Sequence, residues 1–366
     1  MHATPFVGLR APLLAREDPA LLIRSRQRLG PARMLVMNRL ANALFALVLA
    51  ATPSLAWSQN ARGSLDVRWN AGAADCAASP QAPLQVHAYE PNTIILRQSP
   101  CSEFEAGFLY LLIGSDRALL IDTGAVADPS RMPLAKTVAD LLPNVGDAKL
   151  PLLVVHTHGH GDHDAGDSQF AAWPGVKIAP GESAPLRTFF GLSNWPDGIA
   201  HLDLGGRVVD VIPAPGHHPN HLAFYDGNTG LLFSGDFLLP GRLMVDDLAA
   251  YRASARRLVD FVRTRPVAHI LGGHIELDVD GQLYAWGSTH HSNERPLAMQ
   301  RADLLALPAA LDGFNGFHSR HASFVLTHPI HNLVAMAVSV VVALLLMAWG
   351  LRVLLRRRRA RANGRA

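Results

Sequence analysis

The stretch HTHGHGDHDAG, residues 156–166, places four histidines and two aspartates close together in the chain. Imidazoles and carboxylates packed this densely repel their like neighbours when charged, and they cost free energy when removed from water. A bound cation offsets both costs, so the stretch predicts a metal site. Within it, His158, His160, Asp162 and His163 follow the spacing H-x-H-x-D-H.

The spacing of this motif predicts two ions rather than one. Alternate residues of an extended loop point to the same side, so His158 and His160 can chelate one ion. Asp162 and His163 are then directed toward a second ion. The intervening residues are glycines, which let the backbone curve tightly around the ions.

Three further candidate ligands follow, each where an apolar run meets a loop. They are His217 in PAPGHHPNH, Asp236 in LLFSGDFLL and His274 in AHILGGHIE. Loops at strand ends commonly carry functional side chains. The ordered set DTG, THGHGDH, PGH, SGD and GH, from Asp122 to His274, resembles the metallo-β-lactamase superfamily of hydrolases. The resemblance covers about residues 86–290.

The resemblance implies an α/β fold, an αββα sandwich of two mixed β-sheets flanked by helices. It also implies two zinc ions. The first would bind His158, His160 and His217, the second Asp162, His163 and His274, with Asp236 as a bridge. Nitrogen and oxygen ligands of this kind suit Zn²⁺ and also Fe or Mn. Asp122 would orient the histidine loop without binding metal.

The resemblance further implies a hydrolase in which a metal-bridged hydroxide attacks a carbonyl carbon of a small molecule. Asp162 would bind metal and orient the attacking water, so it is the candidate catalytic residue. Asp236 stands where dedicated β-lactamases usually have Cys or Ser, which favours esters, lactones or thioesters as substrates. Glyoxalase II also has Asp there but adds a C-terminal helical domain. The stretch of about 55 residues between His274 and the apolar run at Leu333 is too short for that domain.

Two other functions are compatible with the same motif. One is a mononuclear iron oxygenase resembling the persulfide dioxygenases of this superfamily, which keep the motif but bind one iron. The other is a non-catalytic, membrane-anchored binding protein, which the complete ligand set disfavours. His290 and His291, in WGSTHHSNERPL, are candidates for the substrate cleft, with a solvated loop as the simpler interpretation.

Runs typical of strands and helices alternate along the chain, which indicates an α/β class and positions the motifs at strand ends. We expect strands within 92–98, 107–115, 117–125, 151–158, 176–180, 206–216, 221–236 and 267–274, the last being the final strand. We expect helices within 130–142 and 245–264, and a helix start at 164–173.

Two apolar runs predict export and membrane anchoring. Leu40–Ala56 follows a basic start and ends in small residues, as signal peptides do, with Met34 or Met37 as the candidate true start. Leu333–Leu351 is uncharged and long enough to span a bilayer. An Arg-rich segment follows at 352–366, so the positive-inside rule places it in the cytoplasm and the hydrolase on the periplasmic or extracytoplasmic side of the inner membrane.

The predicted organisation follows from these segments. It comprises an N-terminal extension and signal peptide (1–56), a lead-in (57–85), the metallo-hydrolase domain (86–295), a linker (296–332), a transmembrane helix (333–351) and a cytoplasmic tail (352–366). Cys76 and Cys101 are the only cysteines, and an oxidising compartment would favour a disulfide between them.

The charge distribution argues against nucleic acid as a partner. The whole chain carries a formal charge of +3, but fourteen of its 33 basic residues lie in 1–39 or after Leu351, against two of its 30 acidic residues. The part between therefore carries about −9. An acidic surface repels a phosphate backbone. The oligomeric state is not predicted.

Overall fold

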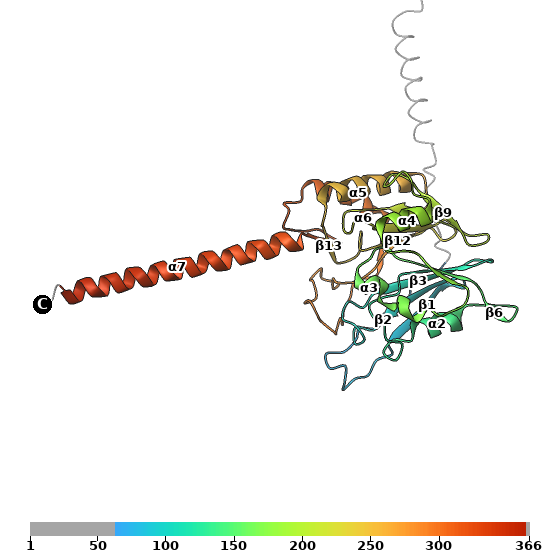
Figure 1. Cartoon of the computed structure of the whole chain (residues 1–366), viewed down its shortest axis with the longest axis horizontal. Coiled ribbons are helices and arrows are strands. Elements are labelled where there is room, and N and C mark those ends of the chain that lie inside the picture. Colours follow the sequence, from blue (N-terminus) through green and yellow to red (C-terminus); the bar gives the residue numbers. More distant parts are fainter. Residues whose placement is uncertain (1–62, 364–366) are drawn as a thin grey trace, which may run out of the picture. The chain divides into compact units, whose positions relative to one another are not determined.

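The computed structural model describes residues 63–363 (Figure 1). The predicted signal peptide, Leu40–Ala56, and the candidate starts Met34 and Met37 lie outside the described residues. Every expected strand and both expected helices occur, each inside its predicted range. Two strands, separated by the turn DGNTG, account for the predicted range 221–236.

The first sheet has the order β1-β2-β3-β4-β7-β8. Its strands are β1 (Leu84–Glu90), β2 (Thr93–Gln98), β3 (Phe108–Ile113), β4 (Ala118–Ile121), β7 (Leu152–Val155) and β8 (Val176–Ile178). The first four pair antiparallel, whereas β4, β7 and β8 pair in parallel. Strands β2, β4 and β7 are buried along their whole length, because both faces of the sheet are covered.

The second sheet has the order β15-β14-β12-β11-β10-β9. Its strands are β9 (Ala200–Asp203), β10 (Val208–Pro213), β11 (Leu222–Asp226), β12 (Leu231–Gly235), β14 (His269–Gly272) and β15 (Ala298–Met299). Only β12 and β14 pair in parallel. Two smaller units complete the strands: the hairpin of β5 (Asn144–Val145) with β6 (Ala148–Lys149), and the sheet β13-β17-β16.

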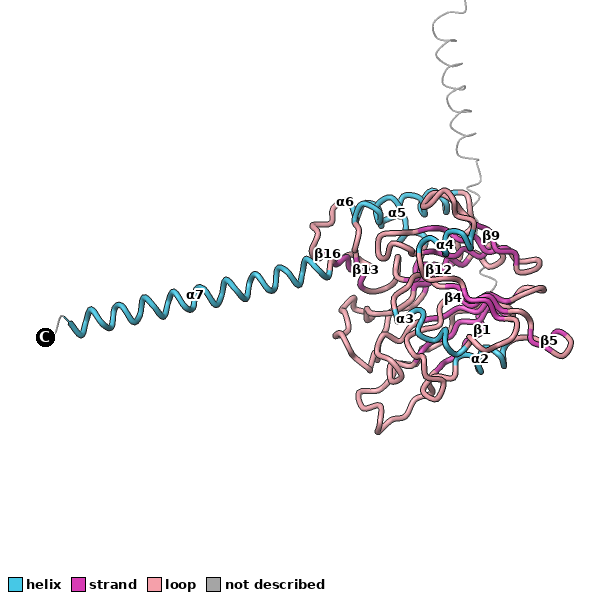
Figure 2. The backbone as a smooth tube through the Cα atoms, viewed as in Figure 1, coloured by secondary structure: helices cyan, strands magenta, loops and turns pink. Residues whose placement is uncertain are grey.

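The two large sheets pack face to face, and helices cover their outer faces (Figures 1 and 2). Ile95, Tyr110, Phe224 and Phe233 belong to the core cluster between the sheets. Helix α2 (Leu134–Leu141) packs on the first sheet, and α5 (Leu248–Arg263) and α6 (Arg301–Asp312) pack on the second. Helix α4 (Ser183–Phe190) adds its buried side to the central core. The predicted αββα sandwich of mixed sheets is thus confirmed.

A buried ion pair connects the two sheets. Arg207 directly precedes β10, and its guanidinium donates to the carboxylate of Asp226 at the end of β11, 2.7 Å away. The same guanidinium reaches the first sheet, where it donates to the Thr93 hydroxyl at 2.6 Å and to the Asn92 carbonyl. Both charged side chains are almost fully buried, so each depends on the other for solvation.

The prediction of a linker over 296–332 is wrong. This segment forms β15, α6, β16 (His318–Arg320) and β17 (Val325–Thr327), and β17 pairs in parallel with β13 (Arg242–Met244). Leu304, Leu307 and Leu311 of α6 are buried against the second sheet's core cluster. The segment looks irregular in the sequence because Pro308 interrupts the helical pattern and its strands are too short to show a period. The expectation that β14 is the final strand is also wrong, because β15, β16 and β17 follow it.

Two further segments differ from expectation. A short helix, α3 (Gly161–Asp164), starts earlier than the predicted 164–173, and a 3₁₀ turn, Ala165–Gln169, continues it. In the predicted lead-in, residues 63–82 make specific contacts with the domain. For example, the Ser64 amide donates to the Tyr89 carbonyl at 3.0 Å, and the His291 amide donates to the Ala71 carbonyl at 2.8 Å. The lead-in lacks an apolar period because it follows loops rather than crossing a sheet.

The C-terminal helix α7 runs from Pro329 to Asn363. Its segment Pro329–Arg359 is long and apolar enough to cross a membrane, and none of its most apolar part is buried in the protein. The helix begins two residues after β17, and its first turn is tied to the domain. His331 contacts the Gly316 carbonyl at 2.8 Å, and the Asn332 side chain donates to the Thr327 hydroxyl at 3.0 Å.

Candidate metal centre

The structure brings all seven predicted ligands together in two adjoining groups. His158, His160 and His217 form the first group, and Asp162, His163, Asp236 and His274 form the second; within each, one ligand atom per residue lies within 4.8 Å of the others. They come from loops or a short helix that follow β7, β10, β12 and β14. The apolar strands are held in the core, so the polar residues immediately after them meet at one edge of the sandwich.

In the first group, three ring nitrogens face a common point. His158 Nε2 lies 2.9 Å from His160 Nδ1, and His217 Nε2 lies 3.1 Å and 3.2 Å from these two atoms. The other nitrogen of His217 lies 3.1 Å from the Met244 carbonyl, to which it can donate. Burial and the neighbouring imidazoles lower the pKa of His158, and burial lowers that of His217. Both effects favour the neutral form, which is the form that binds metal.

The second group is anionic. Asp162 Oδ2 lies 3.3 Å from Nε2 of both His163 and His274. Burial lowers the pKa of His274, but the charge of Asp236 and the hydrogen bond to Asp162 outweigh it and raise the pKa to about 10. Two carboxylates among buried histidines therefore create a strong preference for positive charge at this point.

Asp236 lies between the two groups. Its Oδ1 is 3.5 Å from His163 Nε2 in the second group, and its Oδ2 is 3.7 Å from His217 Nε2 in the first. Among the described residues, Oδ1 is buried and has no hydrogen-bond partner. A buried carboxylate oxygen without a donor is costly, and a cation shared by the two groups would satisfy it. The residues present therefore fit two adjacent metal ions with N/O ligands.

Asp122 holds the histidine loop in place through hydrogen bonds. It follows β4 with a positive φ of 65°, a conformation that Asp tolerates better than most residues. Its two oxygens accept from the Thr157 amide at 2.7 Å, the Thr157 hydroxyl at 2.9 Å and His163 Nδ1 at 2.9 Å. The last contact leaves His163 Nε2 directed toward the second group. Such a carboxylate–histidine contact sets the tautomer and orientation of a ligand.

Replacing Asp122 by asparagine is expected to weaken metal affinity by about 10- to 100-fold, because an amide cannot accept from all three donors. A chelator competition on the purified full chain would measure this loss. Asp147→Asn, in the exposed β5–β6 turn, serves as the matched control. Equal affinity in D122N and wild type would contradict an orienting role.

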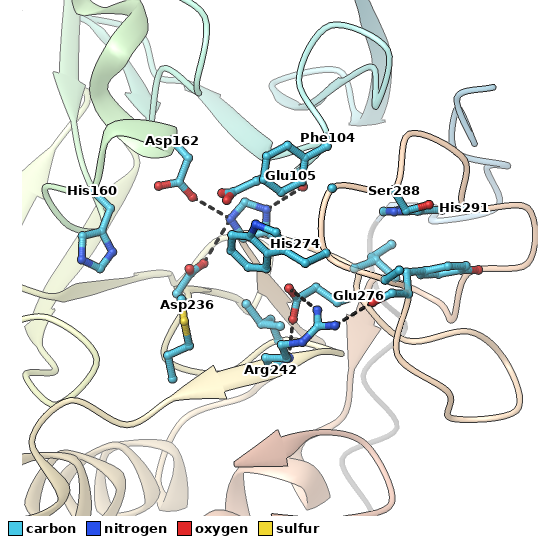
Figure 3. Close-up of a pocket in the computed structure, with 17 residues that line it drawn as sticks. Phe104, Glu105, His160, Asp162, Asp236, Arg242, His274, Glu276, Ser288 and His291 are labelled. Carbon is cyan, nitrogen blue, oxygen red and sulfur yellow. Dashed lines mark hydrogen bonds and ion pairs between the residues drawn. The ribbon is translucent and has the colours of Figure 1, made fainter. Parts of the chain in front are cut away.

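Glu105 is part of the site, although no sequence motif marks it. Its backbone carbonyl accepts from His274 Nδ1 at 2.8 Å, and the residue lines the same pocket as Asp162 (Figure 3). Burial, together with the contact to Asp162, raises the pKa of its carboxyl to about 8. The sequence CSEFEAG contains no ligand spacing, so only the approach of the β2–β3 loop to β14 reveals the residue.

A pocket opens from the second metal group. Asp162, Asp236 and His274 line it, together with Phe104 and Trp286 from two other loops. His291 lines the wall, where its ring stacks on Tyr284 at 4.2 Å.

His290 does not line this pocket, so its predicted place in the cleft is not supported. Its side chain is exposed, and its backbone pairs with Gly72 of the lead-in. Adjacent residues of an extended segment point to opposite sides, so the inward direction of His291 turns His290 outward.

The lead-in is attached to both loops that line the pocket, the one that carries Phe104 and the one that carries Trp286. A disulfide joins Cys76 to Cys101, at the start of the loop that carries Phe104 and Glu105. Ahead of it, the Ala73 amide donates to the Thr289 carbonyl at 3.0 Å, and neighbouring backbone atoms continue this pairing. One segment thus connects two loops that are far apart in the sequence.

Replacing Cys76 and Cys101 by serine is expected to lower the free energy of unfolding by about 3 kcal/mol, because the disulfide closes a loop with a separation of 25 residues. Urea denaturation of the full chain in detergent would measure it. Reducing agent should shift wild type to the same midpoint and leave the double variant unchanged. A wild-type midpoint that resists complete reduction would contradict the prediction.

Parts of the chain resemble known proteins. The family model of the metallo-beta-lactamase superfamily matches residues 103–274. The chain is 28% identical over 229 residues to a hydroxyacylglutathione hydrolase of Rhodobacter capsulatus, covering 60% of this chain and 83% of that protein. It is 26% identical over 219 residues to the acyl-coenzyme A thioesterase MBLAC2 of Gallus gallus, covering 50% and 78%. A solved metallo-beta-lactamase from Pontibacter korlensis matches 63% of this chain and all of that one, with a TM-score of 0.45 and 16% identity.

Proposed function

We propose that the chain is a metal-dependent hydrolase of the metallo-beta-lactamase superfamily, which hydrolyses thioesters or related esters at a centre holding two zinc ions. The observation that carries the proposal is the position of Asp236, whose two oxygens face separate groups of ligands. A carboxylate placed in this way can bridge two ions, whereas a single ion held by one group would not need it.

The names of the relatives narrow the substrate. Hydroxyacylglutathione and acyl-coenzyme A are both thioesters, in which an acyl carbonyl is bonded to sulfur. The sequence had left esters, lactones and thioesters open, and these names favour thioesters. A glutathione-binding domain is not needed for a thioester substrate, since the MBLAC2 name specifies coenzyme A as the thiol.

The proposed chemistry assigns distinct tasks to the chain's residues. Bound zinc ions would polarise the substrate carbonyl and make a water molecule more acidic. Asp162 faces the pocket and stays ionised: burial raises its pKa, but hydrogen bonds from His163 and His274 lower it well below its usual range. Its ionised carboxylate is therefore suited to bind a cation and to orient the attacking water by accepting a hydrogen bond from it. Asp122 and the carbonyls at Met244 and Glu105 hold the imidazoles in position.

Metal content tests the proposal most directly. The full chain, purified in detergent, would be analysed by elemental mass spectrometry and assayed with acetyl and hydroxyacyl thioesters. Two zinc ions per chain together with thioester turnover support the dinuclear hydrolase. One iron per chain, with oxygen consumption on sulfur substrates, would establish the oxygenase instead. A full metal complement without any turnover would favour a binding protein.

We further propose that α7 anchors the hydrolase in the inner membrane, with residues 352–366 in the cytoplasm and the metal centre on the periplasmic side. The apolar segment of α7 is exposed, and four consecutive arginines, 356–359, follow it. Such a pattern is typical of a stop-transfer anchor. The protein should resist alkaline extraction from membranes, and protease added to spheroplasts should digest the domain. Recovery in the soluble fraction would overturn the proposal.

A further inference from the structure

Two aromatic side chains form the mouth of the pocket. Phe104 comes from the loop between β2 and β3, and Trp286 from the segment between β14 and β15. Their rings meet at 5.3 Å in an edge-on arrangement. Trp286 nevertheless remains 64% exposed, and both residues line the pocket. A large exposed aromatic side chain at the rim of a binding site offers apolar area to a ligand.

Three aliphatic side chains line the same pocket as the aromatic pair and the metal ligands. They are Leu239, Met244 and Ile275. Leu239 and Ile275 are almost completely buried, which fixes their position. The pocket therefore combines apolar side chains with the carboxylates and imidazoles that would hold metal.

The pocket offers no free lysine or arginine side chain to a negatively charged leaving group. Among the described residues that line it, Arg242 is the only Lys or Arg. Its guanidinium is already engaged, since it pairs with the Glu276 carboxylate at 2.9 Å and donates to the Tyr284 carbonyl at 2.6 Å (Figure 3). Recognition of phosphates or carboxylates relies on basic groups that are free to make such contacts.

We infer that this pocket selects thioesters by an apolar acyl chain, which lies along Phe104 and Trp286, and not by charge on the leaving thiol. The inference rests on the proposed thioester hydrolysis and specifies its substrate class. It separates this chain from the relatives, whose named substrates carry the charged thiols glutathione and coenzyme A.

The test is a matrix of substrates on the full chain in detergent. Acetyl, butanoyl, hexanoyl and octanoyl groups would each be linked to coenzyme A, to glutathione and to the neutral thiol N-acetylcysteamine. We expect kcat/KM to rise about 2- to 4-fold per methylene, because burying a methylene fully corresponds to about 4-fold. At fixed acyl chain, the three thiols should differ by less than one such step. A flat chain series, or a strong preference for a charged thiol, would overturn the inference.

The variant Trp286→Ala should lower the octanoyl-to-acetyl ratio of kcat/KM by about 10-fold, since it removes most of the aromatic area at the mouth. Phe189→Ala is the matched control, because Phe189 is an exposed aromatic residue on α4 outside the pocket. Its ratio should equal that of wild type. A ratio in W286A that equals wild type would overturn the assignment of the chain to this wall.

A binding measurement separates failure of the inference from failure of the proposed function. If no thioester is hydrolysed, the proposed function fails. The same chains presented as non-hydrolysable thioethers are then measured by calorimetry on the full chain. Affinity that rises with chain length in wild type and falls in W286A supports the apolar site independently of turnover. Affinity without chain dependence overturns it.

Discussion

Replacement of Asp236 by alanine is expected to reduce thioester turnover by at least about 10³-fold while the domain stays folded. Loss of several kcal/mol of charge stabilisation at a metal centre corresponds to a factor of this size. Asp236 faces both ligand groups, so its removal should also lower the metal content below two ions per chain. Since its Oδ1 makes no hydrogen bond within the described residues, little other structure depends on this oxygen.

Steady-state kinetics, elemental mass spectrometry and thermal unfolding of the same preparation would check this expectation. Asp140→Ala, an exposed aspartate on α2, is the matched control and should behave as wild type. The variant His160→Ala should show the same loss through the first group. Near-full kcat in D236A, with an unchanged metal content, would sink the bridging assignment.

The second large effect concerns stability. Asp226→Ala is expected to lower the free energy of unfolding by about 3–5 kcal/mol, because it leaves the buried Arg207 guanidinium without its counter-charge. Arg207 also donates to Thr93 and to the Asn92 carbonyl, so the loss should loosen the packing of one sheet on the other.

Urea denaturation of the full chain in detergent would measure this change as a shift of the midpoint at constant slope. Lys136→Ala provides the control, since the Lys136–Asp140 pair is largely exposed on α2 and such pairs often contribute nothing measurable. A midpoint in D226A that matches wild type would show that water or another group solvates Arg207.

The ligands could be identified from the sequence because their signal is local. His158, His160, Asp162 and His163 lie within six residues, and the later ligands end apolar runs that could only be buried strands. The α/β class could be predicted for the same reason, because each strand has its own apolar pattern, whereas the αββα sandwich was implied by the resemblance of the ordered motifs to the metallo-β-lactamase superfamily. Local spacing therefore carried both the class of fold and the chemistry of its centre.

The surroundings of the centre depend on contacts between distant segments. Glu105 reaches His274 only because the β2–β3 loop lies against the end of β14, and nothing in CSEFEAG signals that approach. The predicted linker folds because Leu304 and its neighbours on α6 meet α5, although Pro308 obscures their period. Whether such a segment is buried depends on the surface of the domain that it packs against, and not on its own sequence pattern.

The residues that line the pocket show most clearly the difference between local sequence signals and long-range contacts. Phe104 and Trp286 are remote in the sequence, and a lead-in segment without any period of its own secures both loops through the Cys76–Cys101 disulfide and the backbone pairing at Gly72. Four of the seven metal ligands obey a short spacing that is visible in the sequence. Residues that shape the substrate site need only meet in space, so long-range packing alone establishes what this hydrolase can accept.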